Sequence, residues 1–223
     1  MKECIVAKSA GFCFGVSRSV KMAEEMLAAE QNCYSLGELI HNDDVVRHLQ
    51  SEGLTVVDLL FRAGIPVDTV SITPEHAVTS SHQVTITCDR SIADEGFSFD
   101  DYDMLVLPGG IPGTPNLKAC EPLTKAVKAF DQAGKGVAAI CAAPSILAEL
   151  GILTNRPATS NPNFQHVLVE NGAILSEEPA VVDGNVITSK GMATAIPFGL
   201  EIVRWFLGDA AVEDLKPRIV LEG

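Results

Sequence analysis

Basic residues are scarce in this sequence. Lysine and arginine together number 16 against 29 aspartates and glutamates, which gives a formal net charge of −13. Binding to nucleic acid depends largely on clustered lysine and arginine side chains that face phosphates. The charge balance therefore argues against a nucleic-acid partner and indicates an acidic protein of the cytoplasm.

Long apolar runs and paired cysteines are also missing. No run reaches the roughly 20 residues that cross a bilayer, and the apolar patch near the N-terminus is interrupted by Lys8 and has no signal-peptide pattern. The six cysteines contain no CxxC pair, and the five histidines have no metal-finger spacing. We therefore expect no membrane partner, no metal or other cofactor, and mostly reduced thiols.

The stretch Gly136–Leu150, GVAAICAAPSILAEL, is the strongest candidate for chemistry. Val137–Ile140 is typical of a strand that is buried on both faces, and Pro144 suits the first turn of a helix, where its missing N–H costs nothing. We therefore expect Cys141 at a strand-to-helix junction, where the unpaired N–H groups of the helix favour a thiolate over a thiol. The alternative is an inert small cysteine, buried in a βα junction.

A second strand end with glycines supports the functional interpretation of Cys141. The apolar run Met104–Leu107 is followed, after one proline, by Gly109 and Gly110, and glycines allow a backbone N–H to point inward. In open α/β sheets, ligands bind at neighbouring carboxyl ends of strands. The two loops together resemble a nucleophile elbow with an oxyanion hole, in which the N–H groups of Gly110 and Ala142 would be the donors.

The remaining patterns predict one main α/β domain without internal repeats. They indicate a helix that ends at residue 63, strands at 66–72, 84–88, 104–107 and 157–159, a helix over 116–132, a β-hairpin at 181–187 and an amphipathic helix over 194–207. In this last helix, Phe198, Trp205 and Phe206 would belong to the core or to an interface, and we expect the core.

Three segments, DMLVLPGG, AAICAAPSILAELGIL and GNVITSKGMATAIPFGLEIVRWFLG, resemble the ThiJ/PfpI superfamily, in particular the branch with the parkinsonism-associated protein and its bacterial relatives. The resemblance runs from about Leu54 to the C-terminus. It implies a flavodoxin-like, doubly wound α/β sandwich with a mainly parallel sheet, similar to class I glutamine amidotransferases, and a homodimer. It also implies glyoxalase- or deglycase-like handling of small dicarbonyls, with Cys141 as nucleophile or as a sensor that is oxidised to sulfinate.

Residues 1–53 carry a different resemblance. AKSAGFCFGV and LGELIHN are similar to motifs of hydroxymethylbutenyl diphosphate reductase, the IspH/LytB family, in which Cys13 matches an iron–sulfur ligand and His41 a diphosphate-binding histidine. The other cluster cysteines and substrate histidines of that family have no counterpart downstream, and one thiolate cannot hold a cluster. We therefore interpret Cys13 and His41 as orphaned residues, and the reductase reaction is an alternative whose ligands are missing.

The two resemblances indicate a natural fusion or an engineered chimera of residues 1–53 with residues 54–223. The ThiJ/PfpI pattern includes a glutamate that approaches the nucleophilic cysteine, and its position falls on Glu52. The opening strand of that pattern is absent, so residues 3–8 or 34–40 would have to replace it. In the second case an extra helical stretch precedes Glu52, and its carboxyl group would miss the sulfur.

Two classes of function remain open. In an enzyme acting on a small carbonyl compound, Cys141 would attack the carbonyl carbon and Glu52 would orient the sulfur. Peptidase chemistry would need a histidine base, but the family position that is histidine in some relatives is Asn161 here, and His166 is expected on the surface of a helix. In the non-enzymatic alternative, the chain is a redox-responsive chaperone for client proteins, or a chimera without activity.

Overall fold

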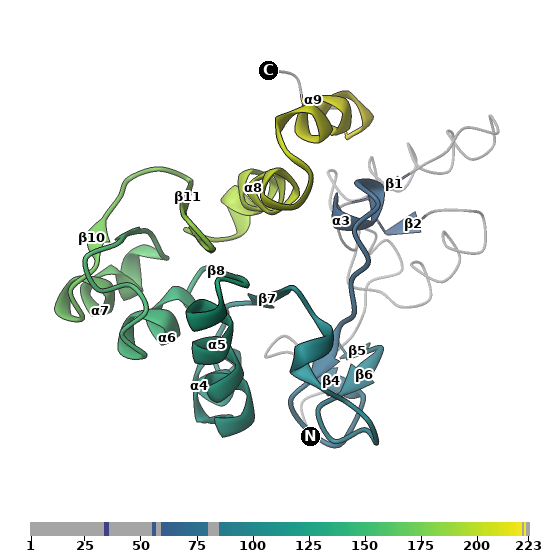
Figure 1. Ribbon diagram of the computed structural model, residues 1–223, viewed down its shortest axis with the longest axis horizontal. Coiled ribbons are helices and arrows are strands. Elements are labelled where there is room, and N and C mark those ends of the chain that lie inside the picture. The colour runs from purple at the N-terminus through teal and green to yellow at the C-terminus, as the bar shows by residue number, and fades with distance from the viewer. Residues whose placement is uncertain (1–33, 36–54, 57–58, 80–84, 220, 222–223) are drawn as a thin grey trace, which may run out of the picture. The chain divides into compact units, whose positions relative to one another are not determined.

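The computed structural model describes residues 34–35, 55–56, 59–79, 85–219 and 221, drawn in colour in Figure 1. The chain divides into two compact units, Met1–Arg62 and Ala63–Gly223. The boundary expected after residue 53 lies outside the described residues, as do Cys13, His41 and Glu52. That boundary therefore stays a prediction.

The first unit contains a short parallel strand pair and a short helix. Strand β1 (Tyr34–Ser35) pairs with β2 (Thr55–Val56), and helix α3 spans Leu59–Arg62. The prediction of a strand at 34–40 is confirmed where it is described. The helix predicted to end at residue 63 ends at Arg62, and Thr55 and Val56 before it lie in a strand, in which β-branched side chains pack well.

The second unit is built on a four-stranded sheet in the order β11-β12-β8-β7. Strands β7 (Met104–Leu107), β8 (Gly136–Ile140) and β12 (Val186–Ser189) run parallel, and β11 (Ala180–Asp183) pairs antiparallel with β12 at the edge. The middle of β8 is completely buried. A continuous apolar run is expected of a parallel strand with both faces covered.

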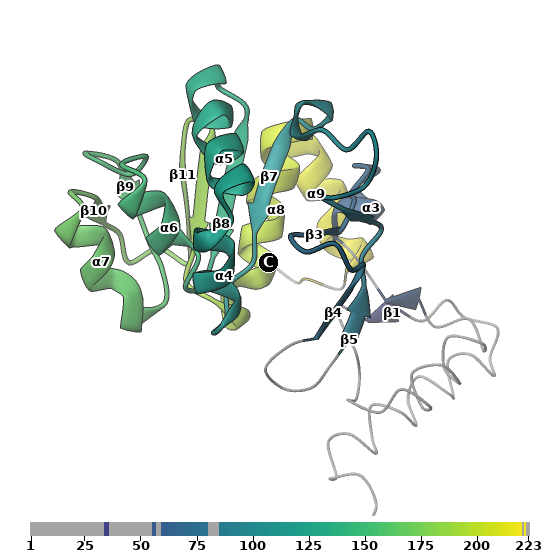
Figure 2. The ribbon, with the colours of Figure 1, turned by 90° about the horizontal axis from the view of Figure 1, so that it is seen from below.

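Helices cover both faces of this sheet, with α5 and α8 on opposite sides of β7 and β8 (Figures 1 and 2). Helix α5 (Glu121–Ala133) turns Val127 and Phe130 into the core beside β8. Helix α8 (Ala195–Leu207) is followed by α9 (Asp209–Arg218), which packs against it. The predicted α/β sandwich, flavodoxin-like and with a mostly parallel central sheet, is confirmed.

Aromatic residues of α8 differ in burial. Phe198 is buried, whereas Trp205 and Phe206 are half-buried and stack edge to face with ring centroids 4.8 Å apart. The expectation of a core role is therefore confirmed for Phe198.

The helix predicted over 116–132 is two helices, α4 (Gly113–Ala119) and α5. Cys120 between them has an extended backbone, with ψ at 94°. The reason is Pro122, which has no N–H to donate to the carbonyl group four residues earlier and whose ring would clash with it. A proline is accommodated in a first helical turn, which is where α5 places it.

Smaller elements complete the second unit. The hairpin predicted at 181–187 is confirmed as β11 and β12, with Gly184 at a φ of 61° in the turn. The strand expected at 66–72 forms only over β3 (Val70–Ser71), which pairs with β6 (Arg90–Ser91). The other elements are β4 (Ala77–Thr79), β5 (Thr85–Thr87), α6 (Pro144–Glu149), β9 (Pro157–Ala158), α7 (Gln165–Glu170), β10 (Ile174–Leu175) and the 3-10 turns Phe99–Asp101, Pro162–Phe164 and Met192–Thr194.

Candidate functional site

Cys141 lies at the predicted junction, directly after β8 and three residues before α6. Its φ is 64°, a left-handed backbone conformation that is uncommon for a residue other than glycine. Strained backbone of this kind persists where the surrounding structure holds it, and it concentrates at functional sites. The half-buried cysteine is therefore presented on a sharp strand-to-helix turn, as in a nucleophile elbow.

Two hydrogen bonds hold the backbone of Cys141 in this conformation. Its N–H donates to the carbonyl oxygen of Ser189, at the end of β12, over 3.0 Å. Its own carbonyl oxygen accepts from the N–H of Asn161, in the loop after β9, over 2.8 Å. Loops from three strand ends thus meet at the cysteine, and its own N–H is already engaged.

Gly109 brings the loop after β7 against the same turn. A Cβ atom at Gly109 would lie 2.5 Å from Cβ of Cys141, 2.8 Å from the carbonyl oxygen of Ile140 and 3.0 Å from the nitrogen of Ala142. No side chain fits within these distances, so only glycine permits this approach of the two backbones. The structure therefore brings together the two strand ends that the sequence singled out.

The N–H groups of Gly110 and Ala142 donate no hydrogen bond to another residue in the described part of the chain. Ala142 is 1% exposed, and a buried N–H without a partner is rare in native proteins. The carbonyl oxygen of Ala142 is engaged differently, because it accepts from the hydroxyl of Ser145 over 2.7 Å.

Asn161 and Gly191 complete the surroundings of the sulfur. A Cβ atom at Gly191 would lie 3.9 Å from Sγ of Cys141 and 4.0 Å from Nδ2 of Asn161. The Asn161 side chain caps the turn Pro162–Phe164, with Oδ1 accepting from the N–H of Asn163 over 3.1 Å. Sulfur and amide nitrogen thus both lie beside the place that a side chain at Gly191 would occupy.

The remaining candidate residues are Glu52, His166 and the other cysteines. Glu52 lies outside the described residues, so its distance to Cys141 stays a prediction. His166 is exposed on α7, which confirms its expected surface position. Of the other described cysteines, Cys88 is 6% exposed and Cys120 is half-buried. Burial raises the pKa of the Cys88 thiol.

Neither metal sites nor membrane spans were found within the ranges that the structure describes. No group of three or more His, Cys, Asp or Glu side chains there is arranged to hold a metal ion. No helix formed by these residues is both long enough and apolar enough to cross a bilayer.

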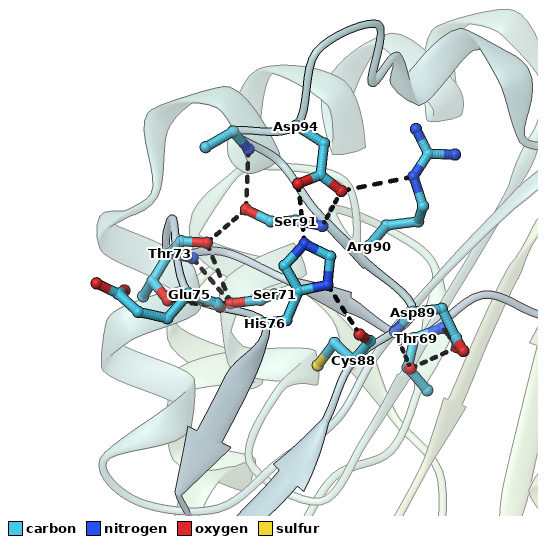
Figure 3. Close-up of polar contacts among 11 residues, drawn as sticks. Thr69, Ser71, Thr73, Glu75, His76, Cys88, Asp89, Arg90, Ser91 and Asp94 are labelled. Atoms are coloured by element: carbon cyan, nitrogen blue, oxygen red, sulfur yellow. Dashed lines mark hydrogen bonds and ion pairs between the residues drawn. The ribbon is translucent and has the colours of Figure 1, made fainter.

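A histidine–carboxylate pair beside the hairpin β4–β5 was missed by the sequence analysis (Figure 3). Nε2 of His76 lies 2.9 Å from Oδ1 of Asp94, and Nδ1 lies 3.1 Å from the carbonyl oxygen of Cys88. Both ring nitrogens therefore face acceptors, which only the protonated ring can satisfy by donating twice. The hydrogen bond to Asp94, then the one to Cys88, raises the pKa of His76.

The surrounding contacts fix this pair in place. The N–H of Ser91 donates to Oδ2 of Asp94 over 2.9 Å, and this bond, followed by the one to His76, lowers the pKa of Asp94. The Ser91 hydroxyl donates to the carbonyl oxygen of Thr73 over 2.6 Å. No local pattern indicates the pair, since its members are 18 residues apart and meet only when β3 and β6 pair.

Comparison with known proteins identifies relatives over most of the chain. The model of the DJ-1/PfpI family matches residues 47–205. DJ-1beta of Drosophila melanogaster is 34% identical over 172 residues, which cover 77% of this chain and 91% of that protein. The Parkinson disease protein 7 homolog of Danio rerio is 33% identical over 175 residues, covering 78% of this chain and 92% of the homolog.

Solved structures agree with these matches. The crystal structure of Drosophila melanogaster DJ-1beta is similar with a TM-score of 0.69 and 33% identity, and the match covers 74% of this chain and 88% of that one. The oxidized form of Toxoplasma gondii DJ-1 gives a TM-score of 0.67 at 28% identity, over 74% of this chain and 89% of that one.

The family match begins at residue 47, ahead of the predicted start near Leu54, so Glu52 lies inside the matched segment. These relatives do not support the resemblance of residues 1–53 to the reductase family. A family model that covers most of the chain, and relatives covered over most of their own length, lead to one conclusion: the chain belongs to the DJ-1/PfpI family.

Proposed function

We propose that this protein acts through Cys141 on small dicarbonyl compounds or their adducts, in a glyoxalase- or deglycase-like reaction. The observation that carries the proposal is the Cys141 turn itself. Its left-handed backbone, its contact with Gly109 and the N–H groups of Gly110 and Ala142, which have no partner among the described residues, support a nucleophile elbow beside an oxyanion hole.

The proposed first step is addition of the Cys141 thiolate to the aldehyde carbon of a 2-oxoaldehyde. The C–S bond forms while the π electrons of the carbonyl group move to oxygen, which becomes an oxyanion. N–H groups of Gly110 and Ala142 donate hydrogen bonds to this oxygen. Protonation of the oxygen then gives a hemithioacetal.

The later steps return the thiol without an external oxidant. Transfer of hydrogen from the first carbon to the second carbon converts the hemithioacetal into a thioester of a 2-hydroxy acid. Water hydrolyses this thioester, which releases the acid and the free Cys141 thiol. In this proposal Glu52 orients the sulfur and carries the proton, a role that its place within the family match supports.

A redox-responsive chaperone is the second candidate. One relative of similar structure was solved in an oxidized form, and Cys141 is half-buried, within reach of small oxidants. Hydrogen peroxide would oxidise the thiolate to sulfenate, and a second peroxide would oxidise sulfenate to sulfinate, each peroxide being reduced to water or hydroxide. In this candidate the oxidation state of Cys141 controls the binding of client proteins.

Lactate formation from methylglyoxal distinguishes the two candidates. Cys141→Ser is expected to abolish it, while Cys120→Ser, which changes another half-buried thiol, leaves it intact. Turnover that survives Cys141→Ser would eliminate the enzyme proposal. Absence of turnover in the wild type, together with peroxide-dependent protection of a client from aggregation, would establish the chaperone.

We propose further that the segment at residues 1–53 holds no iron–sulfur cluster, and that the protein is a cytoplasmic homodimer. Anaerobic purification should give colourless protein, whereas a brown, oxygen-sensitive sample would revive the reductase reaction. Light scattering should give twice the mass of one chain.

A further inference from the structure

The amide of Asn161 has a fixed orientation. Its Oδ1 accepts a hydrogen bond from the N–H of Asn163, and only an oxygen can serve there as the acceptor. This assigns the opposite end of the amide, Nδ2, to the side of Gly191 and Cys141. The backbone N–H of Asn161 bonds to the carbonyl oxygen of Cys141, so the two residues are also tied through the main chain.

Among the residues that the structure describes, none accepts a hydrogen bond from Nδ2. An amide that is held by its oxygen, with its nitrogen on the side of Gly191, is placed to bind an acceptor atom of a ligand near Cys141.

The place of a missing side chain at Gly191 lies near both the sulfur and the amide nitrogen. A Cβ there would be 3.9 Å from Sγ of Cys141, 4.0 Å from Nδ2 of Asn161 and 4.0 Å from Cβ of Cys141. These are ordinary van der Waals separations. A carbon atom bonded to the sulfur would therefore carry its substituents beside Nδ2, and the absence of a side chain at Gly191 keeps this place open.

A vicinal dicarbonyl compound has two carbonyl oxygens, one for the N–H groups of Gly110 and Ala142 and one for Nδ2 of Asn161. When its aldehyde carbon bonds to Cys141, the oxygen of that carbon faces the N–H groups of Gly110 and Ala142. The oxygen on the adjacent carbon is left over. A simple aldehyde has no such second oxygen.

We infer that Asn161 is a specificity-determining residue, whose Nδ2 binds the second carbonyl oxygen of a 2-oxoaldehyde and so selects vicinal dicarbonyls over simple aldehydes. This inference rests on the proposed function, because it presumes that Cys141 adds to the aldehyde carbon. Asparagine does not titrate, so the selection would not depend on protonation of this side chain.

The substitution Asn161→Asp tests the Nδ2 donor by removing it. Aspartate keeps the oxygen that accepts from the N–H of Asn163 and is an equally good cap, so the turn is preserved while Nδ2 is replaced by an anionic oxygen. Asn163→Asp is the matched control. It adds the same charge two residues away, on an exposed side chain.

The measurement is protection of Cys141 from iodoacetamide by methylglyoxal or by propionaldehyde, read by peptide mapping. Hydrogen bonds of this kind contribute about 1 kcal/mol, so Asn161→Asp should raise the half-protecting concentration of methylglyoxal by about fivefold. The value for propionaldehyde should change less than about twofold, as should both values in Asn163→Asp.

Two results would overturn the inference. One is an equal shift for both aldehydes in Asn161→Asp, which would mean that the new charge acts on the thiol alone. The other is an unchanged value for methylglyoxal. Protection does not require turnover, so a wild type that forms no lactate but shows the selective shift would refute the proposed reaction and leave the amide contact standing.

Discussion

Gly109 packs against Cys141 at the ends of two adjacent parallel strands, β7 and β8, with Cβ of Cys141 2.5 Å from the place that a Gly109 side chain would take. This contact sets the distance between the nucleophile turn and the loop that carries the second N–H group. The proposed oxyanion hole therefore depends on the absence of one methyl group.

Gly109→Ala should separate these two loops. The added methyl group overlaps Cys141 and the Ile140 carbonyl oxygen, and overpacking of this kind costs about 1–3 kcal/mol. Urea unfolding should show that loss, and lactate formation should fall more than stability explains. Gly113→Ala is the control, because a Cβ there meets no atom within 4 Å. Equal effects of the two substitutions would contradict the assigned contact.

Arg156 should be the most sensitive charged side chain of the second unit. It is 22% exposed and bonds to Asp131 over 3.0 Å and to both the side chain and backbone of Asp183, so it ties α5 to the β11–β12 hairpin. Arg156→Met leaves two partly buried carboxylates without their cation, at a cost of roughly 2 kcal/mol after allowing for solvent.

The comparison for Arg156→Met is Lys125→Met, which breaks an exposed pair with Glu121. Exposed pairs contribute about 0–1 kcal/mol. Urea unfolding monitored by tryptophan fluorescence gives both values. If Lys125→Met costs as much as Arg156→Met, the assignment of a structural role to Arg156 is wrong.

His76 should make stability depend on pH. Its pKa is raised in the folded protein above 6.5, so its contribution is fully present below about pH 6.5 and is lost as the pH rises through the folded value. His76→Gln should therefore destabilise the protein more at about pH 5.5 than at about pH 8.5.

Unfolding midpoints of wild type and His76→Gln at the two pH values test this dependence. His166→Gln, which removes an exposed histidine, should leave the difference between the two pH values unchanged. A penalty for His76→Gln that grows with rising pH would show that the ring is neutral in the folded state, contrary to the contacts with Asp94 and Cys88.

Local signals made the Cys141 turn predictable. An apolar run too short for a helix, followed at once by Pro144, identified a buried strand and a helix start, and β8 and α6 lie where those residues indicated. Pro122 was an equally local signal. A proline at this position predicts the break between α4 and α5, because it cannot continue a helix from the preceding turn.

Contacts between distant residues were not predictable in the same way. The approach of Gly191 to the sulfur and to the Asn161 amide depends on the lengths of two loops that follow β12 and β9, and single-sequence patterns do not fix such lengths. The pair of His76 and Asp94 depends on a two-residue parallel strand pair, β3 with β6, which is too short to produce a periodic pattern.

Peptide mapping after limiting alkylation with iodoacetamide shows whether Cys141 is the reactive nucleophile. We expect Cys141 to be labelled about tenfold or more faster than the half-buried Cys120, and the buried Cys88, whose pKa is raised, to be labelled after both. Labelling of Cys120 at the same rate as Cys141, or before it, would show that Cys141 is not an activated nucleophile.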